Sequence, residues 1–235
     1  MKRTLDVALA SVGLVIGSMV LVPAMFAIWL EDRHSPLYLS TRAGRGGAPF
    51  RMVKLRSMRH GADRSGVLST AGDDPRITRV GRWVRRLKLD ELVQLWNVLA
   101  GDMSLVGPRP QVLPEVARYT EQERELLSVR PGLTDLASIV FADEGAVLQG
   151  SDHPDRTYDQ VIRPWKSRLG LLYLQRGMST RTDLYLLYLT LLNAASRRRA
   201  LAGVSRLVRQ LDGGAVLVSV ARRTEPLTAA LPPGA

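Results

Sequence analysis

One uncharged apolar segment near the N-terminus constrains the fold of this chain more than any other feature. No charged residue occurs from Val7 to Leu30, and Lys2 and Arg3 precede the segment. At about 1.5 Å per residue it would form a helix of roughly 36 Å, enough to cross a hydrocarbon core of about 30 Å. It is long for a signal peptide, and no convincing small-residue cleavage site follows. The simplest interpretation is a single transmembrane anchor.

Pro23 and the flanking charges favour a different path through the membrane. Pro23 lies inside the apolar segment, where a proline removes a backbone hydrogen bond and kinks or breaks a helix. Lys and Arg residues also follow the segment between Arg33 and Arg59, so both flanks are basic. Cytoplasmic flanks carry the excess of Lys and Arg, which would place both ends on one side. We therefore predict a re-entrant helix-break-helix over residues 1–32 that enters one leaflet.

The segment from Asp73 to Pro110 contains two adjacent carboxylates, Asp90 and Glu91, within a helical apolar period. The period is carried by five aliphatic residues, namely Val80, Val84, Leu87, Leu95 and Val98. A single helix would place Glu91 in the middle of this stripe and Asp90 at its edge. Two ordinary interpretations compete: an ion pair between Arg86 and Asp90 at helical spacing, or a helix that begins near Leu89 with both carboxylates in its first turn.

Cations concentrate around the two carboxylates. Those within reach are Arg82, Arg85, Arg86, Lys88 and, further along, Arg109. Prolines on both sides of Arg109 restrict its backbone, which suits an arginine that binds a phosphate through two donors. Lys54 and Arg56 would share one face of a strand and form either an exposed polar face or a cationic wall for a diphosphate. Together these residues indicate phosphoryl transfer.

Composition narrows the class of partner. The net charge of +11 favours anionic partners, and the absence of cysteine excludes disulfides and thiolate chemistry. Few aromatic residues are interleaved with the cations and no nucleic-acid motif is present, so nucleic acid is not expected to bind. A membrane-anchored basic protein that binds anionic lipid or nucleic acid without catalysis is nevertheless the alternative from another class, and its binding should be indifferent to Asp90.

The remaining pattern predicts a mainly α (α+β) fold. Leu37–Ser40 and Phe50–Leu55 are typical of a small β-hairpin. Leu184–Ala195 is apolar but too short to span a membrane, so it would be a core helix or an amphipathic helix at the interface. We expect three parts, which are the membrane segment at residues 1–32, a cytosolic catalytic domain at 33–195, and a basic helix with a flexible tail at 196–235.

Several long motifs in this order resemble the bacterial sugar transferase family, the monotopic polyprenol-phosphate phosphoglycosyl transferases, in its minimal form. They are PFRMVKLRSM (49–58), DPRITRVGRWVRR (74–86), LDELVQLWNVLAGDMSLVGPRP (89–110) and RPGLTDLASI (130–139). The chain departs from the family at Val93, where Pro is common, and at Lys88, where Ser is frequent. It also departs at Asp135, where many members have Gly.

The resemblance implies an enzyme at the cytoplasmic face of the bacterial plasma membrane. A UDP-sugar would bind with Mg²⁺, Asp90 would attack the sugar-linked phosphate, and UMP would leave. A membrane polyprenyl phosphate, such as undecaprenyl phosphate, would then displace Asp90 and yield a polyprenyl-diphosphate sugar, the first step of surface glycoconjugate synthesis. Glu91 would help hold the metal with Asp90 or orient the nucleophile. Lys54, Arg85 and Arg109 would bind phosphates.

Overall fold

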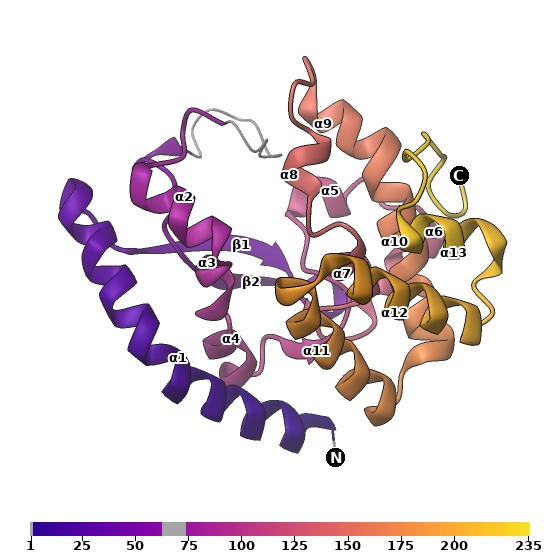
Figure 1. Ribbon diagram of the computed structural model, residues 1–235, viewed down its shortest axis with the longest axis horizontal. Helices are drawn as coiled ribbons and strands as arrows, with labels where there is room; N and C mark the ends of the chain where they lie inside the picture. Colours follow the sequence, from indigo (N-terminus) through magenta and orange to yellow (C-terminus); the bar gives the residue numbers. More distant parts are fainter. Residues whose placement is uncertain (1, 63–73) are drawn as a thin grey trace.

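The computed structural model describes residues 2–62 and 74–235, which form a mainly helical molecule with two small sheets (Figure 1). The predicted fold class is confirmed. The strands are β1 (Leu37–Ala43), β2 (Pro49–Leu55), β3 (Ser104–Val106) and β4 (Gly132–Thr134). The helices up to the middle of the chain are α1 (Lys2–Asp32), α2 (Arg79–Arg86), α3 (Leu89–Leu92), α4 (Leu95–Ala100), α5 (Leu113–Val116), α6 (Glu121–Arg124), α7 (Leu136–Val140) and α8 (Glu144–Val147). Those that follow are α9 (Pro154–Thr157), α10 (Arg163–Leu172), α11 (Thr180–Ala195), α12 (Arg197–Gln210) and α13 (Gly214–Arg222). Short 3₁₀ or π turns fill several junctions, namely η1 (Arg45–Gly47), η3 (Glu125–Leu127), η4 (Tyr158–Ile162) and η5 (Tyr173–Gly177).

The two sheets differ in how far the sequence predicts them. β1 and β2 form the expected antiparallel hairpin, in which Tyr38 faces Lys54. Its turn contains Gly46 and Gly47 at φ 68° and 80°, a left-handed conformation that glycine adopts without strain. β3 and β4 pair in parallel, although they lie far apart in the sequence. Each has only three residues, too few to give a periodic signal, so this pair was not anticipated.

The apolar segment forms one continuous helix, α1, of 31 residues that includes Pro23. The predicted break at Pro23 is therefore wrong as local structure. Proline removes only one backbone hydrogen bond, and its fixed φ is compatible with a helix, so the remaining bonds carry the helix through. In Figure 1 the ribbon of α1 bows along its length. Entry into one leaflet stays a prediction.

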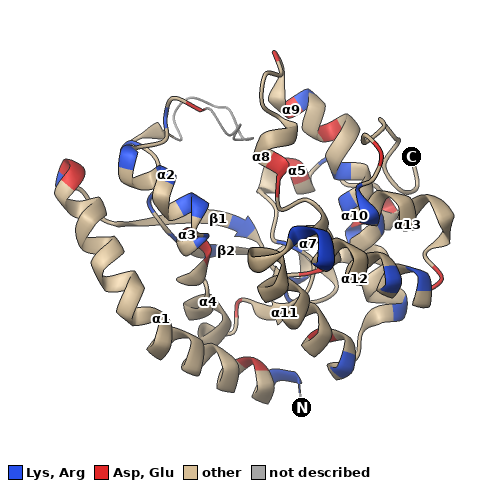
Figure 2. Ribbon diagram, in the orientation of Figure 1, with Lys and Arg blue, Asp and Glu red and all other residues tan. Residues whose placement is uncertain are grey.

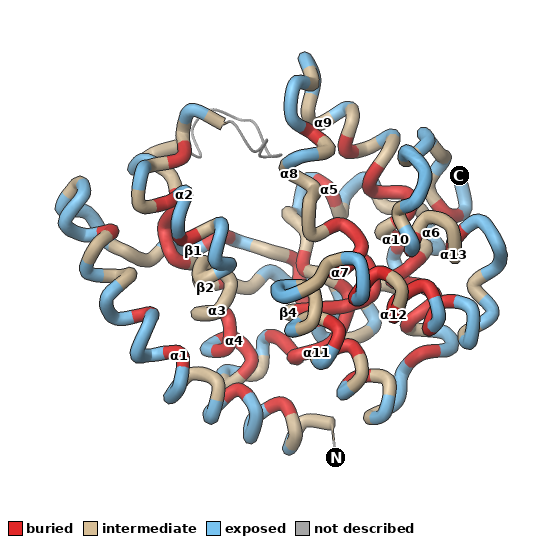
Figure 3. The backbone as a smooth tube through the Cα atoms, in the orientation of Figure 1, coloured by how far each residue is buried: buried red, intermediate tan, exposed pale blue. Residues whose placement is uncertain are grey.

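One face of α1 packs on the rest of the protein and the other is uncovered (Figure 3). Its buried positions recur at spacings of four and seven and are Asp6, Ala10, Gly17, Leu21 and Ile28. Apolar side chains such as Val15, Met19 and Phe26 lie on the exposed side, at 73%, 79% and 58% exposure. Figure 2 shows that α1 carries charge only near its ends. Among the described residues, α1 alone is long and apolar enough to cross a membrane.

Both ends of α1 are bound to the same folded domain. Near the start, Lys2 pairs with Asp183 of α11, and the buried Asp6 accepts hydrogen bonds from Ser104 Oγ at 2.9 Å and Leu105 N at 3.1 Å. At the other end, Asp32 Oδ1 accepts a bond from Arg56 Nη2 at 2.6 Å. α1 is therefore an integral part of the fold along its whole length.

Residues 196–235 are more ordered than predicted. The basic helix is present as α12, but its apolar face, including Ala200, Val204 and Val208, is fully buried in the main core. A further helix, α13, packs on α12. The last dozen residues have no helix or strand, yet Trp165 Nε1 donates to Thr228 O at 2.9 Å. The tail expected to be flexible is therefore attached to the surface of the domain.

Candidate active site

The acidic pair lies at a turn between two short helices. α2 ends at Arg86, Lys88 adopts a left-handed conformation at φ 57°, and α3 begins at Leu89. Asp90 and Glu91 are consequently in the first turn of α3. The single helix predicted through residues 80–98 is wrong, and the alternative start near Leu89 is confirmed. The left-handed residue reorients the chain, so the apolar stripe does not continue across it.

Gly81 allows α2 to pack closely against the residues that follow β2. A Cβ at Gly81 would lie 1.9 Å from the carbonyl oxygen of Ser57, so no other residue fits without moving the backbone. Thr78 caps the helix, because its side chain accepts a hydrogen bond from Gly81 N at 2.9 Å. The start of α2 is thus fixed close to the end of β2.

Glu91 and Arg109 form a two-pronged ion pair. Arg109 Nη1 donates to Glu91 Oε2 at 3.1 Å, Nη2 donates to Oε1, and Nη1 also reaches the Leu133 carbonyl at 3.3 Å. Burial alone would raise the pKa of Glu91, but Arg109, with Lys88 and Lys54 nearby, lowers it to about 2. Glu91 is therefore anionic at neutral pH, and both of its oxygens are engaged by arginine.

Asp90 lies beside this pair but is not paired itself. Its Oδ1 atom is buried and has no hydrogen-bond partner among the described residues. Burial first, and then the negative charge of Glu91, raise its pKa above 3.8, whereas Lys54, Arg85 and Lys88 oppose the rise. A buried carboxylate oxygen that is near cations and bonded to none of them is available to a ligand or a reacting atom.

The β-hairpin contributes two cations to the same site. Burial, together with the positive charges of Arg42 and Arg109, lowers the pKa of Lys54 to about 8. Arg42 was missed from the sequence, although the hairpin register points to it. Tyr38 pairs with Lys54, and Arg42 lies four residues further along β1, so alternation puts Arg42 and Lys54 on one face.

The predicted phosphate-binding residues do not all have the same environment. Lys54, Arg85 and Arg109 converge on the two carboxylates, as their electrostatic influence on Asp90 and Glu91 shows. Arg56 does not join them, because it is buried and paired with Asp32 at the end of α1. Arg56 therefore does not belong to a cationic wall beside Lys54, because it binds the end of α1 instead, and diphosphate binding by Lys54 stays a prediction.

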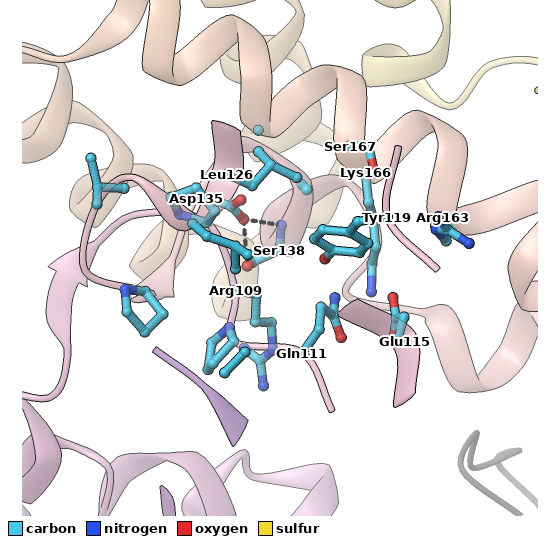
Figure 4. A pocket seen from close by; sticks show the side chains of 18 of the residues that line it. Arg109, Gln111, Glu115, Tyr119, Leu126, Asp135, Ser138, Arg163, Lys166 and Ser167 are labelled. Atoms are coloured by element: carbon cyan, nitrogen blue, oxygen red, sulfur yellow. Dashed lines mark hydrogen bonds between the residues drawn. The ribbon is translucent and has the colours of Figure 1, made fainter. Parts of the chain in front are cut away.

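A narrow pocket is lined in part by Arg109 (Figure 4). Its volume is about 40 Å³, room for water molecules, and its walls include Gln111, Glu115, Tyr158 and Lys166. Tyr158 donates to the buried carboxylate of Glu115 at 3.1 Å. On another side of the pocket Asp135 accepts hydrogen bonds from Ser138 N and Oγ at 2.6 Å and caps α7. None of these pocket residues was singled out from the sequence as part of the site; Asp135 was noted only as a departure from the family.

The structure thus has a long apolar N-terminal helix with an uncovered face, and beside it a carboxylate oxygen of Asp90 that is buried, unpaired and near several cations. Residues 1–197 match the family described as bacterial sugar transferase. The chain belongs to this family.

Individual relatives agree with the family. The chain is 44% identical over 141 residues to the "UDP-glucose:undecaprenyl-phosphate glucose-1-phosphate transferase" of Caulobacter vibrioides, a match that covers 59% of this chain and 53% of the relative. It is 39% identical to the "Galactosyl transferase CpsE" of Streptococcus agalactiae over 59% of this chain and 33% of the relative. It is also 39% identical to the "Undecaprenyl-phosphate galactose phosphotransferase" of Salmonella typhimurium, over 58% and 32%. The chain thus spans about half or less of the length of these relatives.

Proposed function

We propose that this protein is a phosphoglycosyl transferase that moves a sugar phosphate from a UDP-sugar to a membrane polyprenyl phosphate such as undecaprenyl phosphate. The observation that carries the proposal is the buried, unpaired Oδ1 of Asp90, with Lys54, Arg85 and Lys88 close enough to influence its charge. The relatives are named for transfer of sugar phosphates to undecaprenyl phosphate or of galactose, which supports the same substrates here.

In the first step an Asp90 carboxylate oxygen forms a bond to the sugar-linked phosphorus. The bond from that phosphorus to the bridging oxygen breaks, and UMP leaves with the electron pair. In the second step an oxygen of polyprenyl phosphate attacks the same phosphorus, which releases the Asp90 carboxylate and yields polyprenyl-diphosphate sugar. Lys54, Arg85 and Arg109 offset the repulsion between the anions that must meet. Glu91 holds the Arg109 guanidinium in place.

Mg²⁺ would find a single protein donor at this site, since the described residues contain no group of three or more His, Asp or Glu side chains that could hold a metal ion. Mg²⁺ in phosphoryl-transfer sites uses one or two carboxylates together with substrate phosphates, and Asp90 Oδ1 is a free buried carboxylate oxygen. Glu91, which the sequence also suggested as a ligand, offers no free oxygen while Arg109 binds both. The ion would supply neutralisation of charge on the phosphoryl oxygens. Asp90 is therefore the residue that would hold it.

For the membrane, we infer a monotopic arrangement with both ends of α1 on the cytoplasmic side. Two observations support it. The start and the end of α1 are bound to one folded domain through Asp183 and Arg56. A second apolar stripe is exposed on α11, where Leu184, Tyr188 and Leu191 are 48%, 56% and 76% exposed. The opposite face of α11, with Leu186 and Leu189, is buried in the main core, and contact of the exposed stripe with the membrane stays a prediction.

UMP release tests the proposed activity. Membranes containing the full chain are incubated with undecaprenyl phosphate and each of a panel of UDP-sugars, and one UDP-sugar is expected to yield UMP. Asp90→Asn should abolish both UMP release and capture of labelled sugar phosphate on the protein, whereas Asp152→Asn removes an exposed carboxylate and should leave both unchanged. Normal turnover by Asp90→Asn would refute the mechanism and favour a non-catalytic basic membrane protein.

Site-directed labelling tests the topology. The chain has no cysteine, so single substitutions at the exposed Thr4 and Ser35 report the two ends of α1 without background. In vesicles of either orientation, a membrane-impermeant maleimide should reach both positions from the cytoplasmic side. Labelling from opposite sides would establish a spanning helix instead.

A further inference from the structure

The segment that carries Asp90 and Glu91 rests on a hydrophobic cluster separate from the main core. Two of the four buried members of this cluster, Leu21 and Ile28, belong to α1, and the others are Leu55 of β2 and Val84 of α2. Leu89 and Leu92, the residues on either side of the acidic pair, pack against this cluster. The N-terminal apolar helix therefore forms part of the packing beneath the acidic pair.

α1 accommodates this segment at a pair of glycines. A Cβ placed on Gly17 would lie 3.0 Å from Leu92 Cδ2, and one on Gly13 would lie 2.9 Å from Leu95 Cδ1. Two glycines four residues apart in an apolar helix usually indicate a seam for a second membrane helix. Here side chains of the same chain fill the notch. The glycines thus serve contacts within the protein.

α1 also holds the beginning of the same segment. Glu31 Oε1 accepts a hydrogen bond from Arg79 N at 2.9 Å, and Oε2 accepts one from Val80 N at 3.4 Å. The first backbone N–H groups of a helix have no partner within it, and a carboxylate there is stabilised by the helix dipole. α1 therefore contacts both ends of the segment 79–92. Glu31 binds the first residues of that segment, and Gly17 packs against Leu92, its last residue.

We propose that α1 is a positioning element of the active site as well as a membrane anchor, and that Gly17 acts through Leu92 to set the position of the Asp90–Glu91 turn. α3 has only four residues and follows a left-handed residue, so it has little stability of its own and takes the position that its packing allows. Displacement of a reacting group by about 1 Å can cost about a hundredfold in rate. The position of α1 in the bilayer would thereby influence the position of the Asp90 carboxylate, because α1 positions Leu92.

The test compares two matched substitutions in the full-length protein in lipid nanodiscs, Gly17→Leu and Gly13→Leu. Both add the same side chain to the same face of α1, but the first meets Leu92 of α3 and the second meets Leu95 of α4. Amide hydrogen exchange, measured without substrate, should increase about tenfold at residues 87–93 in Gly17→Leu and at residues 95–100 in Gly13→Leu. Adding Leu92→Ala to Gly17→Leu makes room for the new side chain and should restore protection.

Measurement of UMP release rests on the proposed function, whereas the hydrogen-exchange measurement does not depend on it. For the UDP-sugar that releases UMP, Gly17→Leu should lower kcat about tenfold with little change in KM. Gly13→Leu should lower kcat less, even if it lowers the melting temperature by the same amount. Equal exchange at residues 87–93 in the two variants, or no recovery with Leu92→Ala, would overturn the positioning role. Absence of UMP release from the unmodified protein would instead count against the proposed function, and the exchange result would still decide the inference.

Discussion

Replacing Arg109 by methionine tests the electrostatic account of the site, because it leaves Glu91 buried without its partner. Both side chains are largely shielded, with 24% of Glu91 and 27% of Arg109 exposed, so solvent screens the pair only in part. The pKa of Glu91 lies at about 2 instead of 4.5. At 1.36 kcal/mol for each pH unit, the difference corresponds to about 3 kcal/mol of stability at pH 7. This agrees with the roughly 3–5 kcal/mol that breaking a buried pair costs.

The sign of the pH dependence follows from the lowered pKa. A carboxyl whose pKa is depressed in the folded state contributes its full stabilisation above 4.5 and loses it as the pH falls towards about 2. The stability gap between the unmodified protein and Arg109→Met should therefore be largest near neutral pH and narrow in acid. For a chain of this size, about 3 kcal/mol lowers the melting temperature by roughly 6–12 °C.

The assay is thermal unfolding in detergent for Arg109→Met, Glu91→Gln and the double variant. If the cost in Arg109→Met comes from a stranded charge, Glu91→Gln should recover much of it when the two are combined, because the neutral amide has no charge to leave unpaired. Losses that simply add in the double variant, or a loss below about 1 kcal/mol in Arg109→Met, would show that the pair is not coupled as the geometry requires.

Three further outcomes are expected. Because the pKa of Lys54 is lowered to about 8, kcat/KM for the UDP-sugar should fall as the pH rises through that value. Lys54→Arg should move this fall to higher pH. If the pH profile of the initial rate of UMP release is the same in Lys54→Arg, Lys54 is not the titrating group. Pro23→Leu restores a helical N–H, but α1 is already continuous and bound to the domain at both ends, so both cysteine positions should still be labelled from the cytoplasmic side; labelling from opposite sides would show that Pro23 itself sets the topology. Truncation after Thr224 removes the bond from Trp165 to Thr228 and the packing of Leu227, and should lower the melting temperature by several degrees; no change would show that the tail is merely adjacent.

The sequence indicated which charged residues gather around Asp90 better than it indicated how they pair. Asp90, Glu91, Lys54, Arg85 and Arg109 converge as expected, because a local cluster of charge around an apolar segment is visible in the order of residues. Arg42 was overlooked, since its place depends on the register of β1 against β2. The pairing of Arg109 with Glu91 was also not foreseen, because it requires the loop after β3 to return beside α3, and that contact leaves no trace in periodicity.

By itself the sequence determined that the chain has an apolar N-terminal helix, a β-hairpin, a mainly helical fold and a cluster of cations around Asp90. These properties depend on local composition, spacing and charge, which a chain carries in any conformation. The structure decided that α1 runs unbroken through Pro23, that α2 ends at Arg86 before the left-handed Lys88, and that Glu91 is paired whereas Asp90 Oδ1 has no partner among the described residues. The pairing of Glu91 depends on a contact between residues far apart in the chain, whose energy outweighs local preference only once the elements have packed together.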